Sequence, residues 1–156
     1  MRVIKRAKTA VKSELANLSD LRLAADAAWH AGLWGRSLEL MELLPASDSS
    51  QGDDPYTDRF KAVSILRDRG VTFELVETLH TAVYGFLADR GVRIAGTSLY
   101  IDESPGDQTI FVTIEVAESE DVTRKLDEEL TEVLFSAVDV VPLGTFSIDL
   151  GAQEPT

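Results

Sequence analysis

The sequence contains no cysteine, and this absence excludes several kinds of protein at once. Without thiols the chain has no disulfide framework, no cysteine nucleophile and no cysteine-ligated metal site. No apolar run approaches the length of a membrane span, and no hydrophobic stretch follows the basic first residues as it would in a secretory signal. We therefore expect a cytoplasmic protein without a membrane span.

Basic residues are also scarce, with 15 lysines and arginines against 27 acids and a net charge of −12. Five of the bases precede the first acid, Glu14, and from there on 10 bases face 27 acids, a charge of −17. An acidic body repels nucleic acid, so a nucleic-acid partner is disfavoured for the main surface. The early bases are candidate contacts to a protein partner or a second copy: Arg2, Lys5, Arg6, Lys8 and Lys12.

The part of the chain that most clearly predicts a sheet runs from residue 91 to residue 150. Ile110, Val112, Ile114 and Val116 alternate with other side chains, as in a strand with one face on a core. We expect strands before and after this one, a hairpin turn at 103–107, an amphipathic helix with its apolar side chains between Val122 and Ala137, and a disordered tail at 151–156. Three strands leave two sheet edges, which invites pairing with another sheet.

The preceding residues predict helices. An amphipathic helix is expected over 2–18, with Ser19 as the N-cap of a second helix that ends at Gly32. Further helices are expected over 35–44, 58–68 and 72–90, with a mobile loop at 46–58. The stretch 24–41 resembles half of a tetratricopeptide-type hairpin, but such repeats need about three copies to bury a core. The prediction is therefore an α+β fold: a helical layer over 19–90, packed with a small three-stranded sheet region over 91–150 in the order helix-strand-strand-helix-strand.

The only two histidines lie at helical spacing from acids. Asp26 precedes His30 by four residues and Glu77 precedes His80 by three, so each pair shares a helix face. Glu-x-x-His is a spacing that metal sites in helical bundles use, and neutral imidazoles suit Zn or Fe. One hypothesis is thus a small metal-dependent enzyme with an Asp/His/Glu/His site between helices. The alternative is that these are ordinary polar residues of amphipathic helices.

No motif for a serine nucleophile, a phosphate-binding glycine loop or a dinucleotide site is present. Trp29 and Trp34 flank the glycine turn, where they could form an aromatic contact surface or pack at the hairpin corner. The first hypothesis is therefore a non-enzymatic protein-protein interaction or assembly module that forms oligomers or joins a larger complex. A third is an acidic decoy for a nucleic-acid-binding protein, with the acids of 117–139 as its charged face.

Overall fold

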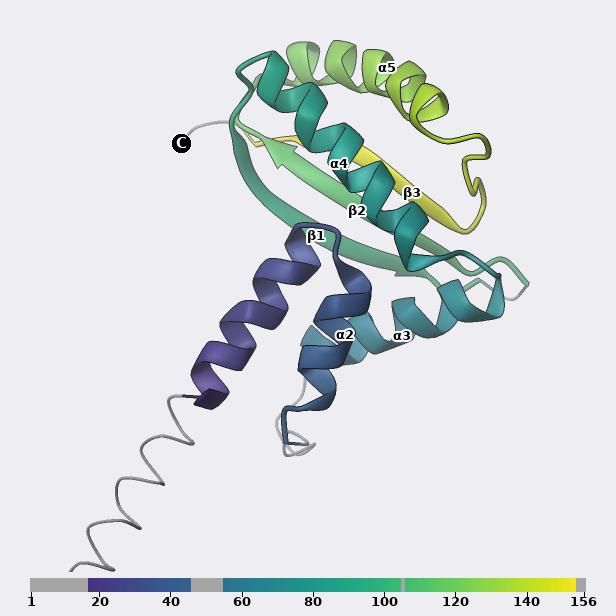
Figure 1. The fold of residues 1–156 in the computed structure, drawn as a ribbon. Coiled ribbons are helices and arrows are strands. Elements are labelled where there is room, and N and C mark those ends of the chain that lie inside the picture. The colour runs from purple at the N-terminus through teal and green to yellow at the C-terminus, as the bar shows by residue number, and fades with distance from the viewer. Residues whose placement is uncertain (1–16, 46–54, 105, 154–156) are drawn as a thin grey trace, which may run out of the picture.

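The computed structural model describes residues 17–45, 55–104 and 106–153. Helices come first and a three-stranded sheet follows, which confirms the α+β prediction (Figure 1). After a helix over residues 17–30, the elements are α2 (Trp34–Glu42), α3 (Pro55–Asp68), α4 (Phe73–Asp89), β1 (Ile94–Asp102), β2 (Thr109–Val116), α5 (Glu120–Ala137) and β3 (Phe146–Ala152).

The sheet has the strand order β1-β2-β3, with β2 in the centre. β1 and β2 form an antiparallel hairpin in which Tyr100 lies opposite Phe111. β2 and β3 run parallel, with Ile114 beside Leu150, because α5 returns the chain to the start of the sheet. The expected crossover through the last helix is therefore confirmed.

One face of the sheet, the covered face, carries the hydrophobic core. Figure 1 shows α4 and α5 side by side over the sheet and α2 and α3 beside β1. The alternation read from the sequence explains this arrangement, since every second side chain of β2 is buried and those between are only half-buried. The buried side chains of β2, β3, α4 and α5 include Ile110, Val112, Ile114, Phe146, Ile148, Leu79, Val83, Leu126 and Leu130.

The opposite face, here called the open face, points away from the described helices. It carries alternate side chains of the three strands: Ser98, Tyr100, Asp102, Phe111, Thr113, Glu115, Ser147 and Asp149. Tyr100 is 66% exposed.

Two neighbouring pairs on the open face are in contact. The Tyr100 and Phe111 ring centroids lie 6.1 Å apart, and the Thr113 hydroxyl donates to the Asp149 carboxylate at 2.7 Å. The open face thus combines aromatic surface with carboxylates.

Three predicted boundaries are wrong. Ser19 lies inside a helix that already includes residue 17, so it caps nothing. Residues 55–58, expected in a mobile loop, belong to α3, which begins at Pro55, a residue whose fixed φ suits the first helical turn. Residues 151 and 152, expected in a disordered tail, belong to β3, which continues to Ala152 beside Val116. The basic segment before residue 17 lies outside the described residues, and so do residues 46–54 and 154–156.

Candidate functional site: a cleft between the helical hairpin and strand β1

The turn at Gly32 sets the position of the first two helices against α4. Gly32 has a φ of +84°, and the turn is closed by the Leu33 N–H, which donates to the Ala28 carbonyl at 2.9 Å. A Cβ atom at residue 32 would lie only 2.3 Å from the His80 Cβ. Glycine is therefore required twice, by the left-handed backbone and by the close approach to α4.

The two tryptophans stack on each other just beside this turn. Their ring centroids lie 4.0 Å apart with an interplanar angle of 7°, and Trp34 also meets the edge of Phe146 at 5.4 Å. The indole N–H of Trp34 donates to the Trp29 carbonyl at 3.2 Å. Both side chains are buried. They act in packing at the hairpin corner and do not form an exposed contact surface.

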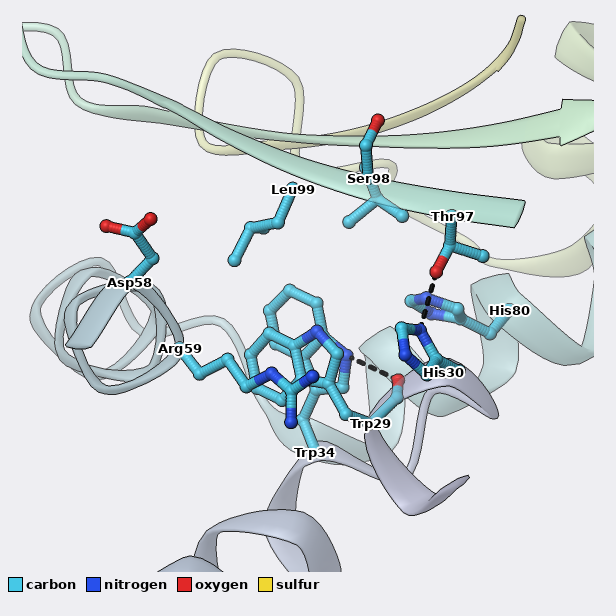
Figure 2. Close-up of a pocket in the computed structure, with 10 residues that line it drawn as sticks. Trp29, His30, Trp34, Asp58, Arg59, His80, Thr97, Ser98 and Leu99 are labelled. Carbon is cyan, nitrogen blue, oxygen red and sulfur yellow. Dashed lines mark hydrogen bonds between the residues drawn. The ribbon is translucent and has the colours of Figure 1, made fainter. Parts of the chain in front are cut away.

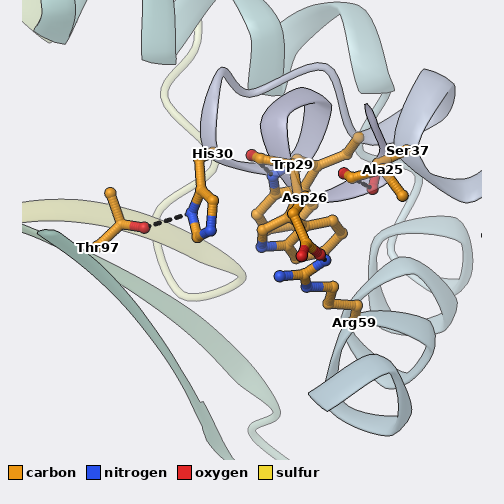
Figure 3. A network of polar contacts seen from close by, with 8 residues as sticks. Ala25, Asp26, Trp29, His30, Ser37, Arg59 and Thr97 are labelled. Carbon is orange, nitrogen blue, oxygen red and sulfur yellow. Dashed lines mark hydrogen bonds and ion pairs between the residues drawn. The ribbon is translucent and has the colours of Figure 1, made fainter. Parts of the chain in front are cut away.

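Arg59 of α3 is a buried cation that sequence reasoning missed. Its guanidinium donates to the Asp26 carboxylate at 2.6 Å and lies beside the Trp29 ring, 5.3 Å from the ring centroid (Figure 3). The guanidinium is also 5.3 Å from the ring centroid of Tyr56. The signal was present, because Arg59 shares a helical stripe with Ala62, Val63 and Leu66. A charge on an apolar stripe needs a partner, and the ion pair with Asp26 supplies it.

His30 links the helical hairpin, which consists of the helix over residues 17–30 and α2, to strand β1. Its Nδ1 lies 2.5 Å from the Thr97 hydroxyl, and its backbone carbonyl accepts a hydrogen bond from the Tyr84 hydroxyl. Burial lowers the pKa of His30 and the Arg59 charge lowers it further, against an opposing effect of Asp26. The ring is therefore neutral at pH 7.

His80 of α4 is 2% exposed. Its Nδ1 lies 2.8 Å from the Val76 carbonyl, so Nδ1 carries the proton and Nε2 is a hydrogen-bond acceptor. Burial lowers the pKa of His80, although the bond to Val76 opposes this shift. His80 is thus a neutral, oriented imidazole.

These side chains surround a cleft of about 210 Å³, shown in Figure 2. The stacked tryptophans and His80 form one side, β1 and β2 form the other, and Arg59 and Asp58 of α3 lie at one end. The sheet contributes Thr97, Ser98, Leu99 and Val112. With two neutral imidazoles, a paired guanidinium and aromatic walls, the cleft is suited to binding a small molecule.

The residues proposed for a metal site are only partly brought together. His30 and His80 line the same cleft, but Asp26 is engaged by Arg59, and Glu77 is exposed on α4. In the part of the chain that the structure describes, no three histidine or carboxylate side chains form a group that could hold a metal ion. A Zn or Fe site remains a prediction.

Comparisons of the chain with protein-family models, with curated proteins and with solved structures found no match. No helix among the described residues is long and apolar enough to cross a membrane. The function is therefore inferred from the chain's own residues and geometry.

Proposed function

We propose that the chain is a non-enzymatic protein-protein assembly module, and that it assembles with further copies of itself through the open face of the sheet. The observation that carries this proposal is the composition of that face. Residues 94–116 and 146–152, which span all three strands, contain no lysine or arginine. The open face presents Tyr100 and Phe111 together with Asp102, Glu115 and Asp149.

Such a face has the chemistry to bind a basic segment that carries apolar side chains. Aromatic residues are enriched at interfaces, and carboxylates around them select a cationic partner. The chain itself supplies one, because its first twelve residues hold five bases and no acid. A second copy is thus the proposed occupant, with its basic segment on the open face.

The outer edge of β3 is a less suitable surface for a second sheet. The Phe146 N–H donates to the Pro142 carbonyl at 3.1 Å, and the Leu150 N–H donates to the Asp127 carboxylate at 3.0 Å. Backbone donors that are already bonded do not pair with another strand, which is one way in which proteins protect a sheet edge. This supports assembly through the face of the sheet and not through that edge.

Sedimentation velocity on the full chain and on a variant that lacks residues 2–12 tests the proposal. We expect the full chain to be a dimer or larger at low salt, and the truncated chain to associate at least about 10-fold more weakly while it still unfolds cooperatively. Assembly by the truncated chain at the full-length affinity would contradict the proposal.

A charge reversal on the open face tests whether association depends on this surface or on the total negative charge of the chain. Glu115→Lys should weaken association, whereas Glu128→Lys, a reversal at an exposed site on α5, should not. Equal losses in both variants would show that total charge governs association and that the open face is not the interface.

The metal-dependent enzyme remains a second proposal, because His30 and His80 line one cleft. It requires metal to stay with the gently purified protein, and native mass spectrometry reports this directly. Loss of the metal in His80→Ala would support it, and a metal-free chain would count against it.

A further inference from the structure

We propose that the cleft between the helical hairpin and β1 binds an uncharged, planar nitrogen heterocycle of one or two rings, which donates a hydrogen bond to Nε2 of His80. This site is separate from the open face, so the two proposals can fail independently. The assignment rests on an unused acceptor, on the shape of the cleft and on its charge balance.

The acceptor is Nε2 of His80. The Nδ1–H of this ring is used by the Val76 carbonyl, and no described residue bonds Nε2. Among the described residues no fully buried side-chain nitrogen or oxygen lacks a partner, so Nε2 keeps some accessible surface, and His80 is one of the residues that line the cleft. An oriented acceptor in an otherwise buried side chain selects a ligand with an N–H or O–H group.

The shape selects a flat molecule. The stacked Trp29 and Trp34 rings form one wall, and the Leu99 side chain approaches from the sheet (Figure 2). Val112 of the central strand also lines the cleft. Aromatic faces favour a stacked or edge-on ring over a compact polar group. The volume of about 210 Å³ is below the roughly 300–1,000 Å³ of pockets that hold drug-sized ligands, which limits a ligand to roughly one or two small rings.

The charges select an uncharged ligand. The Arg59 guanidinium is already paired with Asp26 at 2.6 Å and lies over Trp29, so it offers no free positive charge to an anion. Asp58 lines the cleft with an exposed carboxylate, which also repels anions. A cation would have to displace Arg59 from the cation–π position over the Trp29 ring.

Tryptophan fluorescence tests the proposal without a label, because Trp29 and Trp34 are the only two tryptophans of the chain. Benzimidazole and adenine are titrated into the full-length protein with excitation at the red edge of indole absorption. A saturable change at up to millimolar concentration is expected with at least one of them, and sodium benzoate, an anion of similar size, should cause none.

Two substitutions of His80 give the decisive comparison. His80→Asn keeps a donor for the Val76 carbonyl and removes the acceptor at the Nε2 position, so binding should weaken at least about 10-fold. His80→Gln places an amide oxygen near the lost Nε2 and should bind more tightly than His80→Asn. Thr81→Ser, an exposed change beside His80 on the same helix, is the matched control and should bind like the original chain.

Thermal unfolding of each variant identifies any loss of fold, and Trp29→Phe provides a second variant that leaves His80 intact. With Trp29→Phe, the remaining Trp34 signal should still report binding. The proposal is overturned if no heterocycle gives a saturable change, if benzoate binds equally well, or if folded His80→Asn binds as tightly as the original chain. A response to Zn²⁺ alone, lost in both His80 variants, would replace the heterocycle by a metal ion.

Discussion

The two faces of the sheet differ in what their side chains do. On the covered face, Ile110, Ile114 and Val116 are fully buried against helices, and their role is to hold the fold together. On the open face, Tyr100 is 66% exposed beside carboxylates that have no basic neighbour on the strands. Apolar burial stabilises the fold and exposed aromatic surface favours binding, so the proposal gives the two faces of the sheet different roles.

The largest expected effect is a difference between the two faces in how much a substitution lowers the free energy of unfolding. Ile114→Ala removes a fully buried side chain from the central strand and should lower the free energy of unfolding by about 2–5 kcal/mol. Ser147→Ala, on the open face of the neighbouring strand, should change it by less than about 0.5 kcal/mol. Urea unfolding of both variants measures the difference, and equal losses would mean that the open face is also part of the core.

A second effect concerns the close contact between the helical hairpin and α4 at Gly32. Gly32→Ala imposes an unfavourable left-handed backbone and a clash with His80, whereas at Gly70, with a φ of +71°, no atom lies within 4 Å of an added Cβ. Gly70→Ala should cost about 1–2 kcal/mol from the backbone alone. Gly32→Ala should cost about 1–3 kcal/mol more, because it also overpacks the contact with α4. Similar melting temperatures for the two variants would contradict this close approach.

A smaller effect concerns the pH dependence of stability, to which the buried imidazole of His80 contributes. Burial lowers the pKa of His80, so below the ordinary imidazole range the unfolded chain binds a proton that the folded chain does not. Stability is therefore present above that range and falls as the pH falls through it. His80→Asn should reduce the difference in unfolding free energy between about pH 5 and about pH 7.5. An unchanged difference would show that His80 does not contribute to it.

The sequence predicted the elements that depend on local patterning. Alternation at Ile110–Val116 predicted the central strand, and the caps of α4 and α5 agree with local chemistry, since Thr72 and Ser119 each accept a hydrogen bond from a backbone N–H. The cleft could not be predicted in the same way. Its residues come from separate elements, and the bond between His30 and Thr97 joins positions 67 residues apart.

The ion pair between Asp26 and Arg59 shows the limit of predicting a metal site from residue spacing within one helix. Spacing within one helix placed Asp26 beside His30, but the partner of the carboxylate comes from α3, 33 residues away. Local spacing identifies which side chains share a face and cannot identify what the next helix presents to them. Arg59 was detectable only as a charge on an apolar stripe.

Zero-length carbodiimide cross-linking between isotopically distinct copies tests the proposed interface most directly. A mixture of ¹⁴N and ¹⁵N chains is cross-linked at low salt, and peptides that join the two isotopes are identified by mass spectrometry. The open-face proposal predicts links from Lys5, Lys8 or Lys12 of one copy to Asp102, Glu115 or Asp149 of the other. Inter-copy links confined to the acids of α5, or a chain that stays monomeric at low salt, would contradict it.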